Sequence, residues 1–78
     1  MKVLIIEDEN ALRELISRAL KKEQYVVEEA ATYDEACERL EMFTYDCILL
    51  DIMLPDGNGL DLLKTFKTEG KAPNVIII

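Results

Sequence analysis

The sequence contains no histidine, and its 78 residues include only two cysteines, Cys37 and Cys47. Without histidine, a hydrolytic triad is excluded, as are the zinc sites that combine histidine with cysteine. Two cysteines outside any metal-binding spacing do not form a disulfide framework. We expect both to be reduced, small apolar residues in a cytosolic protein.

Long apolar runs are missing as well, and acidic residues outnumber basic ones by 16 to 9. No apolar run approaches the roughly 18 residues of a membrane-spanning helix, and the first three residues enter a strand pattern rather than a signal peptide. The net charge of −7 disfavours direct nucleic-acid binding by this segment, because affinity for phosphate backbones comes mainly from Lys and Arg. It favours cations or basic protein partners, with a merely solvated acidic surface as the alternative. We expect a cytoplasmic location without membrane contact.

Two patterns alternate along a chain that is long enough for one small domain. Short runs rich in apolar or β-branched residues predict four strands: residues 2–6, 25–31, 46–50 and 74–78. Apolar residues at helical spacing predict three helices: about 9–22, 32 to near 43, and from Asn58 to Gly70. The run 25–31 carries two glutamates, so we expect it at an edge of the sheet.

Local signals refine the three helices. Apolar residues of the first helix predict one buried stripe: Leu12, Leu15, Ile16, Ala19 and Leu20. Thr32 and Glu35 fit a capping box that opens the second helix, and Asn58 is suited to cap the third. Apolar residues of the third helix recur in the same way: Leu60, Leu62, Leu63 and Phe66.

This order of elements, β-α-β-α-β-α-β, predicts an α/β fold with a doubly wound parallel sheet and the strand order 2-1-3-4. The order places a switch point between strands 2–6 and 46–50, where ligands of open α/β sheets bind. Glu7 and Asp8 follow the first of these strands, and Asp51 follows the second. We therefore expect these three carboxylates to converge in one crevice.

Three carboxylates in a small space repel one another, and a divalent cation held by oxygen ligands, such as Mg²⁺, removes the repulsion. The residues after the first strand, "EDEN", offer negative charge rather than the backbone donors that bind a flavin or a dinucleotide. A metal-neutralised aspartate can attack a phosphoryl group and become an acyl phosphate. Simpler alternatives remain: Glu7 and Asp8 could be first-turn acids of a helix, and Asp51 could be a turn former.

The sequence resembles the receiver domains of bacterial two-component response regulators, which have a flavodoxin-like (CheY-like) fold. The resemblance covers the whole chain and rests on three segments: "VLIIEDEN", "DCILLDIMLPDGNGLDLL" and "PNVIII". It implies that Asp51 is the phosphoacceptor and that Mg²⁺ is bound by Glu7, Asp8, Asp51 and the backbone carbonyl of Met53. It also implies that the turn around Pro55, Gly57 and Gly59 shapes the loop below the phosphorylation site.

The resemblance further implies the biological setting. A sensor histidine kinase would phosphorylate Asp51 in a Mg²⁺-dependent phosphorelay. An output domain, for which DNA binding is one candidate activity, would belong to the parent protein. Asp51 would be modified without turnover, so the segment would not be an enzyme. A phosphatase of the aspartate-nucleophile type is a weaker alternative, since such enzymes use a second aspartate where this chain has Met53.

Two residues that the resemblance calls for have no counterpart here: a Ser or Thr after the fourth strand and a Lys after the fifth. We expect residues 1–78 to be the N-terminal portion of a receiver domain, with four strands and three helices and without the fifth strand and last helices. The alternative is a fragment without phosphotransfer, of structural or assembly interest only. An apolar strand at an open edge favours pairing, so we expect self-association through 75–78.

Overall fold

The computed structural model describes residues 1–68 and 74–78. Its elements run in the order β1 (Lys2–Ile6), α1 (Asn10–Lys22), β2 (Val26–Ala30), α2 (Tyr33–Met42), β3 (Cys47–Leu50), β4 (Met53–Leu54), β5 (Gly57–Asn58), α3 (Gly59–Thr68) and β6 (Asn74–Ile77). The predicted alternation of strands and helices is confirmed. The β4–β5 hairpin occupies a segment for which only a turn was predicted. Gly70, the predicted end of the third helix, lies outside the described residues.

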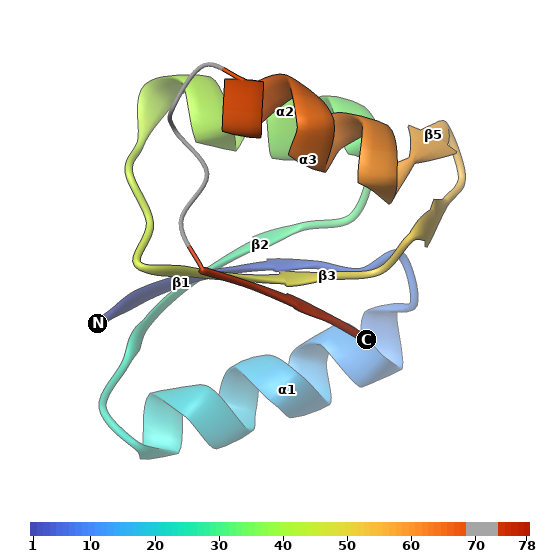
Figure 1. Ribbon diagram of the computed structural model, residues 1–78. Helices are drawn as coiled ribbons and strands as arrows, with labels where there is room; N and C mark the ends of the chain where they lie inside the picture. The colour runs from blue at the N-terminus through green and yellow to red at the C-terminus, as the bar shows by residue number, and fades with distance from the viewer. Residues whose placement is uncertain (69–73) are drawn as a thin grey trace.

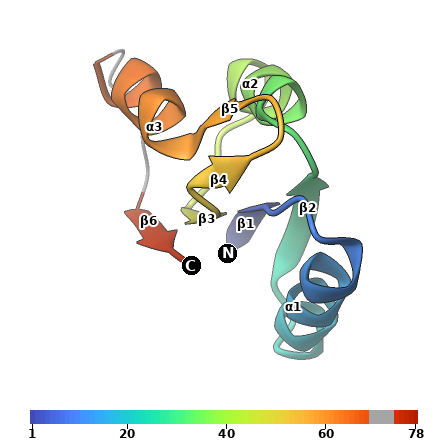
Figure 2. The ribbon, with the colours of Figure 1, turned by 90° about the vertical axis from the view of Figure 1, so that its right-hand side faces the viewer.

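Four strands form a parallel sheet in the order β2-β1-β3-β6, which confirms the predicted fold class and strand order. α1 covers one face of this sheet, and α2 and α3 cover the other (Figure 1). Figure 2 views the molecule from the carboxyl ends of the strands and shows β1 and β3 side by side at the centre, with β2 at one edge. This doubly wound arrangement buries the two central strands from both sides.

The uniformly apolar β1 supplies the centre of the core. Residues Val3 to Ile6 are each at most 2% exposed, because alternate side chains enter opposite layers. Leu4 and Ile6 pack with residues of α2, β3 and α3, such as Ala36, Leu50 and Leu62. Val3 and Ile5 pack on the other face with Cys47, against Ile16 and Leu20 of α1. The two cysteines are free, with Cys47 buried and Cys37 partly buried.

The packing of α1 corrects one prediction. Leu12, Leu15 and Ala19 are exposed, with Leu15 64% exposed, so the expected single buried stripe was wrong for these three residues. The helix instead turns the neighbouring face to the sheet, where Ile16 and Leu20 make the apolar contacts. Ser17 is also buried on this face, and within the described part of the chain its hydroxyl has no hydrogen-bond partner.

The starts of α2 and α3 follow the predicted capping signals in part. Thr32 accepts the N–H of Glu35 through its hydroxyl, but the Glu35 carboxylate accepts the N–H of Ala31 rather than that of Thr32. Asn58 accepts the N–H of Leu60, as expected of a helix cap. In α3 Leu62 is buried, whereas Leu60 is 37% exposed.

The side chains of Leu63 and Phe66, the other apolar residues noted in this helix, lie outside the described part. No helix of residues 1–68 is long and apolar enough to cross a membrane.

Candidate functional site

The carboxyl ends of β1 and β3 carry the three predicted acidic residues. Ile6 lies level with Leu50 in the register, and the N–H of Asp51 donates to the carbonyl of Ile6 at 2.9 Å. The residues that follow each strand therefore emerge at the same edge of the sheet. One carboxylate oxygen each from Glu7, Asp8 and Asp51 lies within 4.8 Å of the other two. The structure thus brings together three residues that are up to 44 positions apart in the sequence.

The three carboxylates differ in exposure. Glu7 is only 5% exposed, Asp51 is half-buried and Asp8 is exposed. Burial raises the pKa of the Glu7 carboxyl, and the neighbouring charges of Asp51 and Asp8 raise it further, against a hydrogen bond from the Glu9 N–H that lowers it. A cation bound among these groups would favour their charged forms.

The simpler alternatives can be checked against the same geometry. α1 begins at Asn10 after its N-cap residue Glu9, so Glu7 and Asp8 precede the first helical turn rather than belonging to it. Asp51 does form a turn, because its Oδ1 accepts the N–H of Met53 at 3.0 Å. This role is compatible with chemistry at the site, since a carboxylate has a second oxygen and several acceptor positions.

The loop after Asp51 is a tight hairpin that contacts α2. Met53 pairs with Asn58 and Leu54 with Gly57, so Pro55 and Asp56 form a two-residue connection. The Asp56 carboxylate accepts the N–H groups of Tyr33 at 2.6 Å and Asp34 at 3.1 Å, at the start of α2. These hydrogen bonds lower the pKa of Asp56. The hairpin is thereby tied to a neighbouring helix.

Two glycines permit close approaches within this loop. A Cβ at Gly59 would lie 2.6 Å from the backbone oxygen of Asp51. A Cβ at Gly57 would lie 2.6 Å from the ring of Tyr33. Gly59 therefore lets the start of α3 pack directly against the backbone of the candidate phosphoacceptor, where any larger residue would push it away. The Met53 side chain is 82% exposed and takes no part in these contacts.

Sequence analysis did not single out Asp56 or Arg13 as residues of this region. Asp56 stands in a turn sequence, and nothing local indicates that its partners lie 22 and 23 residues away. Arg13 donates to the carbonyl of Glu7 from inside α1. Arg13 lies three residues after Asn10, so the two side chains are neighbours on the helix surface. This spacing could have linked Arg13 to the loop that precedes the helix.

The carboxylate cluster has dimensions that suit a small divalent cation. Mg²⁺ binds oxygen ligands at about 2.1 Å, so two oxygens on one ion are at most about 4.2 Å apart. At most one pair among three oxygens on an octahedral ion can be that far apart, and adjacent pairs lie about 3.0 Å apart. The oxygens of Glu7, Asp8 and Asp51, within 4.8 Å of one another, therefore have to draw closer together on a shared ion, or to bind it in part through water. The donor set consists of hard oxygens alone, which is the chemistry Mg²⁺ prefers.

A family model described as the response regulator receiver domain matches residues 3–78. The chain belongs to this family. This confirms the resemblance stated on sequence grounds. Among the curated relatives, the transcriptional regulatory protein ResD of Bacillus subtilis is 35% identical over 77 residues, which is 99% of this chain and 32% of ResD. The chain thus spans about a third of the length of this relative.

Solved receiver structures share the fold. The receiver domain of the Francisella response regulator 1452 superposes with a TM-score of 0.92 at 28% identity, covering 97% of this chain and 63% of that one. The response regulator TrrA from Thermotoga maritima, determined in complex with Mg²⁺-BeF, gives a TM-score of 0.90 at 29% identity, covering 97% of this chain and 66% of that one. Both likenesses support the partial flavodoxin-like sheet described above.

Proposed function

We propose that Asp51 accepts a phosphoryl group from a phosphohistidine of a sensor histidine kinase, with Mg²⁺ held by Glu7, Asp8, Asp51 and the backbone carbonyl of Met53. The observation that carries this proposal is the convergence of three carboxylate oxygens within 4.8 Å at the switch point of the sheet. Membership of the receiver family supports the phosphoacceptor role. The complex of TrrA with Mg²⁺-BeF supports the choice of metal.

The chemistry assigns distinct tasks to the residues of this site. A carboxylate oxygen of Asp51 attacks phosphorus, an O–P bond forms, and the P–N bond to the histidine breaks with its electron pair passing to the ring nitrogen. The N–H of Met53 holds the Oδ1 of Asp51 and thereby orients the carboxylate. Bound Mg²⁺ would offset the negative charges that meet at the site. Each transfer leaves the phosphoryl group covalently attached to Asp51, so the segment acts as a phosphoryl acceptor rather than as an enzyme with turnover.

Metal binding should be visible as a gain in stability. Mg²⁺ at ten times its dissociation constant should stabilise the fold by about 1.4 kcal/mol, because the ion binds only the folded state. Asp8→Ala should remove most of this gain, whereas Asp34→Ala, which removes an exposed acid on α2, should retain it. Thermal melts with Mg²⁺ and with EDTA make the comparison. A Mg²⁺-dependent shift that survives Asp8→Ala undiminished would exclude this metal site.

We propose further that residues 1–78 form the N-terminal portion of a receiver domain in the cytoplasm, whose parent protein carries an output domain. The transcriptional regulatory activity in the name of ResD makes DNA binding a candidate output. The resemblance to receiver domains calls for a Ser or Thr and a Lys that help to bind the phosphoryl group. These two residues would then belong to the rest of the parent protein. A polypeptide limited to residues 1–78 would accept phosphoryl groups poorly, and the parent protein would accept them well.

A polypeptide of these 78 residues is also expected to self-associate through β6. Ile76 and Ile77 are 53% and 50% exposed, and within the described residues β6 pairs with β3 alone. Pairing of β6 with a second copy would bury these side chains and add backbone hydrogen bonds. Repulsion between two chains of charge −7 opposes this pairing, but salt at 0.1 M screens the repulsion beyond about 10 Å.

Light scattering over a concentration series measures this association. Ile77→Lys should shift the equilibrium toward monomer, and Met42→Lys, which places the same charge at another exposed apolar residue, should not. A compact monomer at every concentration would contradict the expected self-association.

A further inference from the structure

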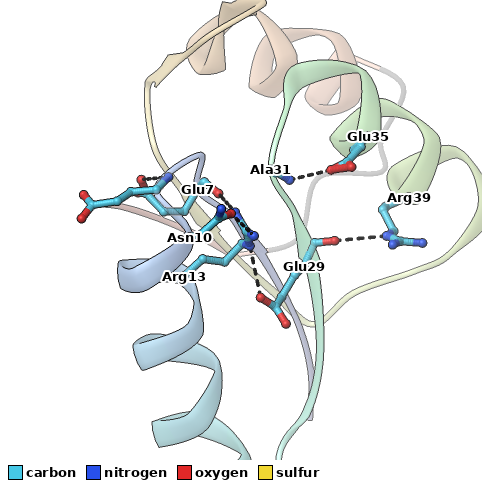
Figure 3. Close-up of polar contacts among 8 residues, drawn as sticks. Glu7, Asn10, Arg13, Glu29, Ala31, Glu35 and Arg39 are labelled. Carbon is cyan, nitrogen blue, oxygen red and sulfur yellow. Dashed lines mark hydrogen bonds and ion pairs between the residues drawn. The ribbon is translucent and has the colours of Figure 1, made fainter.

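Arg13 connects α1, β2 and the acidic loop, which consists of residues 7–9 between β1 and α1 (Figure 3). Its Nη1 donates to the backbone carbonyl of Glu7 at 2.8 Å, its Nε donates to the carboxylate of Glu29 on β2 at 3.2 Å, and its Nη2 donates to the Asn10 side chain at 2.5 Å. The Arg13 side chain is only 16% exposed. Three directed hydrogen bonds from a planar guanidinium fix its orientation far more firmly than a single surface ion pair would.

These contacts hold the backbone of Glu7 from both sides. Its N–H donates to the carbonyl of Ala30 on β2 at 3.0 Å, and its carbonyl accepts from Arg13. The carboxylate of Glu7 also accepts the N–H of Glu9 at 3.1 Å. The loop is therefore anchored to β2 and α1 on both sides of Asp8, which is exposed.

We propose that Arg13 is a positioning residue for the metal site, which keeps the segment Glu7–Asp8 at the distance from Asp51 that a shared cation requires. This inference rests on the proposed function, because it assumes that these carboxylates bind Mg²⁺. Glu29 contributes by orienting the guanidinium and by balancing its charge. Partners that hold metal ligands in place commonly change metal affinity by 10- to 100-fold when they are replaced.

The direction in which Mg²⁺ affinity changes when Arg13 is replaced distinguishes a positioning role from a purely electrostatic one. If Arg13 acted only through its positive charge, its removal would lower the repulsion on a cation and tighten Mg²⁺ binding. If it positions the loop, its removal weakens binding in spite of the lost charge. Arg13→Gln should therefore raise the dissociation constant for Mg²⁺ about tenfold. Arg13→Lys should also raise it, because lysine keeps the charge but lacks the fork that reaches three acceptors.

Arg18→Gln is the matched control. Arg18 lies on the same helix but is 76% exposed and pairs with Glu14 one turn away. The substitution removes the same charge and should leave Mg²⁺ affinity unchanged or slightly tighter. Glu29→Gln tests the mechanism from the other end of the contact and should weaken Mg²⁺ binding in the same direction as Arg13→Gln.

The experiment is a calorimetric titration of the parent protein with Mg²⁺. Melting temperatures in EDTA and hydrogen exchange at the Glu7 and Glu9 amides, which donate to Ala30 and to the Glu7 carboxylate, are measured in parallel. The proposal expects weaker Mg²⁺ binding and faster exchange at these amides in Arg13→Gln, at a temperature where the variant is fully folded. Wild-type affinity in Arg13→Gln would overturn it and leave the proposed function intact. A wild-type protein that binds no Mg²⁺ would overturn both. If Arg13→Gln does not fold, Glu29→Gln decides through exchange at the same amides, because the loss of a negative charge would weaken Mg²⁺ binding by itself. Unchanged amide exchange in Glu29→Gln overturns the proposal.

Discussion

Asp51→Asn should abolish phosphoryl transfer from acetyl phosphate to the parent protein that contains residues 1–78. Asparagine keeps the shape of the side chain and an oxygen that can accept the N–H of Met53, but its amide is no nucleophile for phosphorus and cannot form the acyl phosphate. The fold should tolerate the change, because it removes one of three negative charges that lie within 4.8 Å. Incorporation is followed by intact-protein mass spectrometry over a time course.

Asp46→Asn provides a matched control for this variant. Asp46 precedes β3 as Asp51 follows it, and its carboxylate accepts the N–H of Lys2 at the far end of the strand. The control should be phosphorylated at the wild-type rate. If Asp51→Asn incorporated phosphoryl groups at the wild-type level, the assignment of Asp51 as the phosphoacceptor would be wrong. Loss of phosphoryl incorporation in both variants would indicate a general effect on the fold.

Gly59→Ala should destabilise the protein by about 2–3 kcal/mol, which is the upper range for overpacking a close contact. The added Cβ would lie 2.6 Å from the backbone oxygen of Asp51 and 3.1 Å from the Cα of Ile52, and neither backbone atom can move alone. The N–H of Gly59 also donates to the carbonyl of Ile52 at 2.7 Å, so relief of the clash would strain this bond. A domain of ordinary stability, 5–15 kcal/mol, would lose a large share of it.

Gly57→Ala is the comparison for this prediction. Its added Cβ would meet the Tyr33 ring at 2.6 Å, but a side chain can rotate away where a backbone cannot. Urea denaturation of both variants should therefore give the larger loss for Gly59→Ala. Phosphoryl transfer should also slow in Gly59→Ala, since the displaced backbone belongs to Asp51 itself. A stability equal to wild type in Gly59→Ala would show that the loop has more room than the structure indicates.

The sequence predicted the site because its two most apolar early runs, 2–6 and 46–50, had to be central strands of a parallel sheet. Once both were central, the residues after them had to meet at one edge, which brought Glu7 and Asp8 to Asp51. Both steps follow from burial and connection handedness, which are readable along the chain. The roles of these residues as metal ligands and phosphoacceptor remain proposals that the experiments above test.

The face of α1 could not be chosen from spacing alone. Leu12, Leu15 and Ala19 share helical spacing with Ile16 and Leu20, so two adjacent faces of the helix are apolar. The structure turns the face with Ile16 and Leu20 toward the sheet and leaves Leu15 64% exposed. The choice depends on how the helix docks on the strands, and no periodicity encodes that rotation.

The contacts that hold the site in place join residues far apart in the sequence, and they could not be predicted from the sequence either. Asp56 binds the start of α2 across more than 20 residues, and Arg13 joins the acidic loop to Glu29, 16 residues on. Each looks like an ordinary turn or helix-surface residue until the fold brings its partner close. The sequence thus indicates which groups carry the chemistry more readily than which groups hold them in place.

Asp51 is proposed to carry the phosphoryl group, and the most direct measurement locates this group chemically. The parent protein is treated with acetyl phosphate and Mg²⁺, reduced with borohydride, which converts an aspartyl phosphate to homoserine, and digested for peptide mass spectrometry. We expect homoserine at position 51 alone, and none when Mg²⁺ is replaced by EDTA. Homoserine at another aspartate such as Asp8 or Asp56, or none at position 51 in the presence of Mg²⁺, would contradict this assignment.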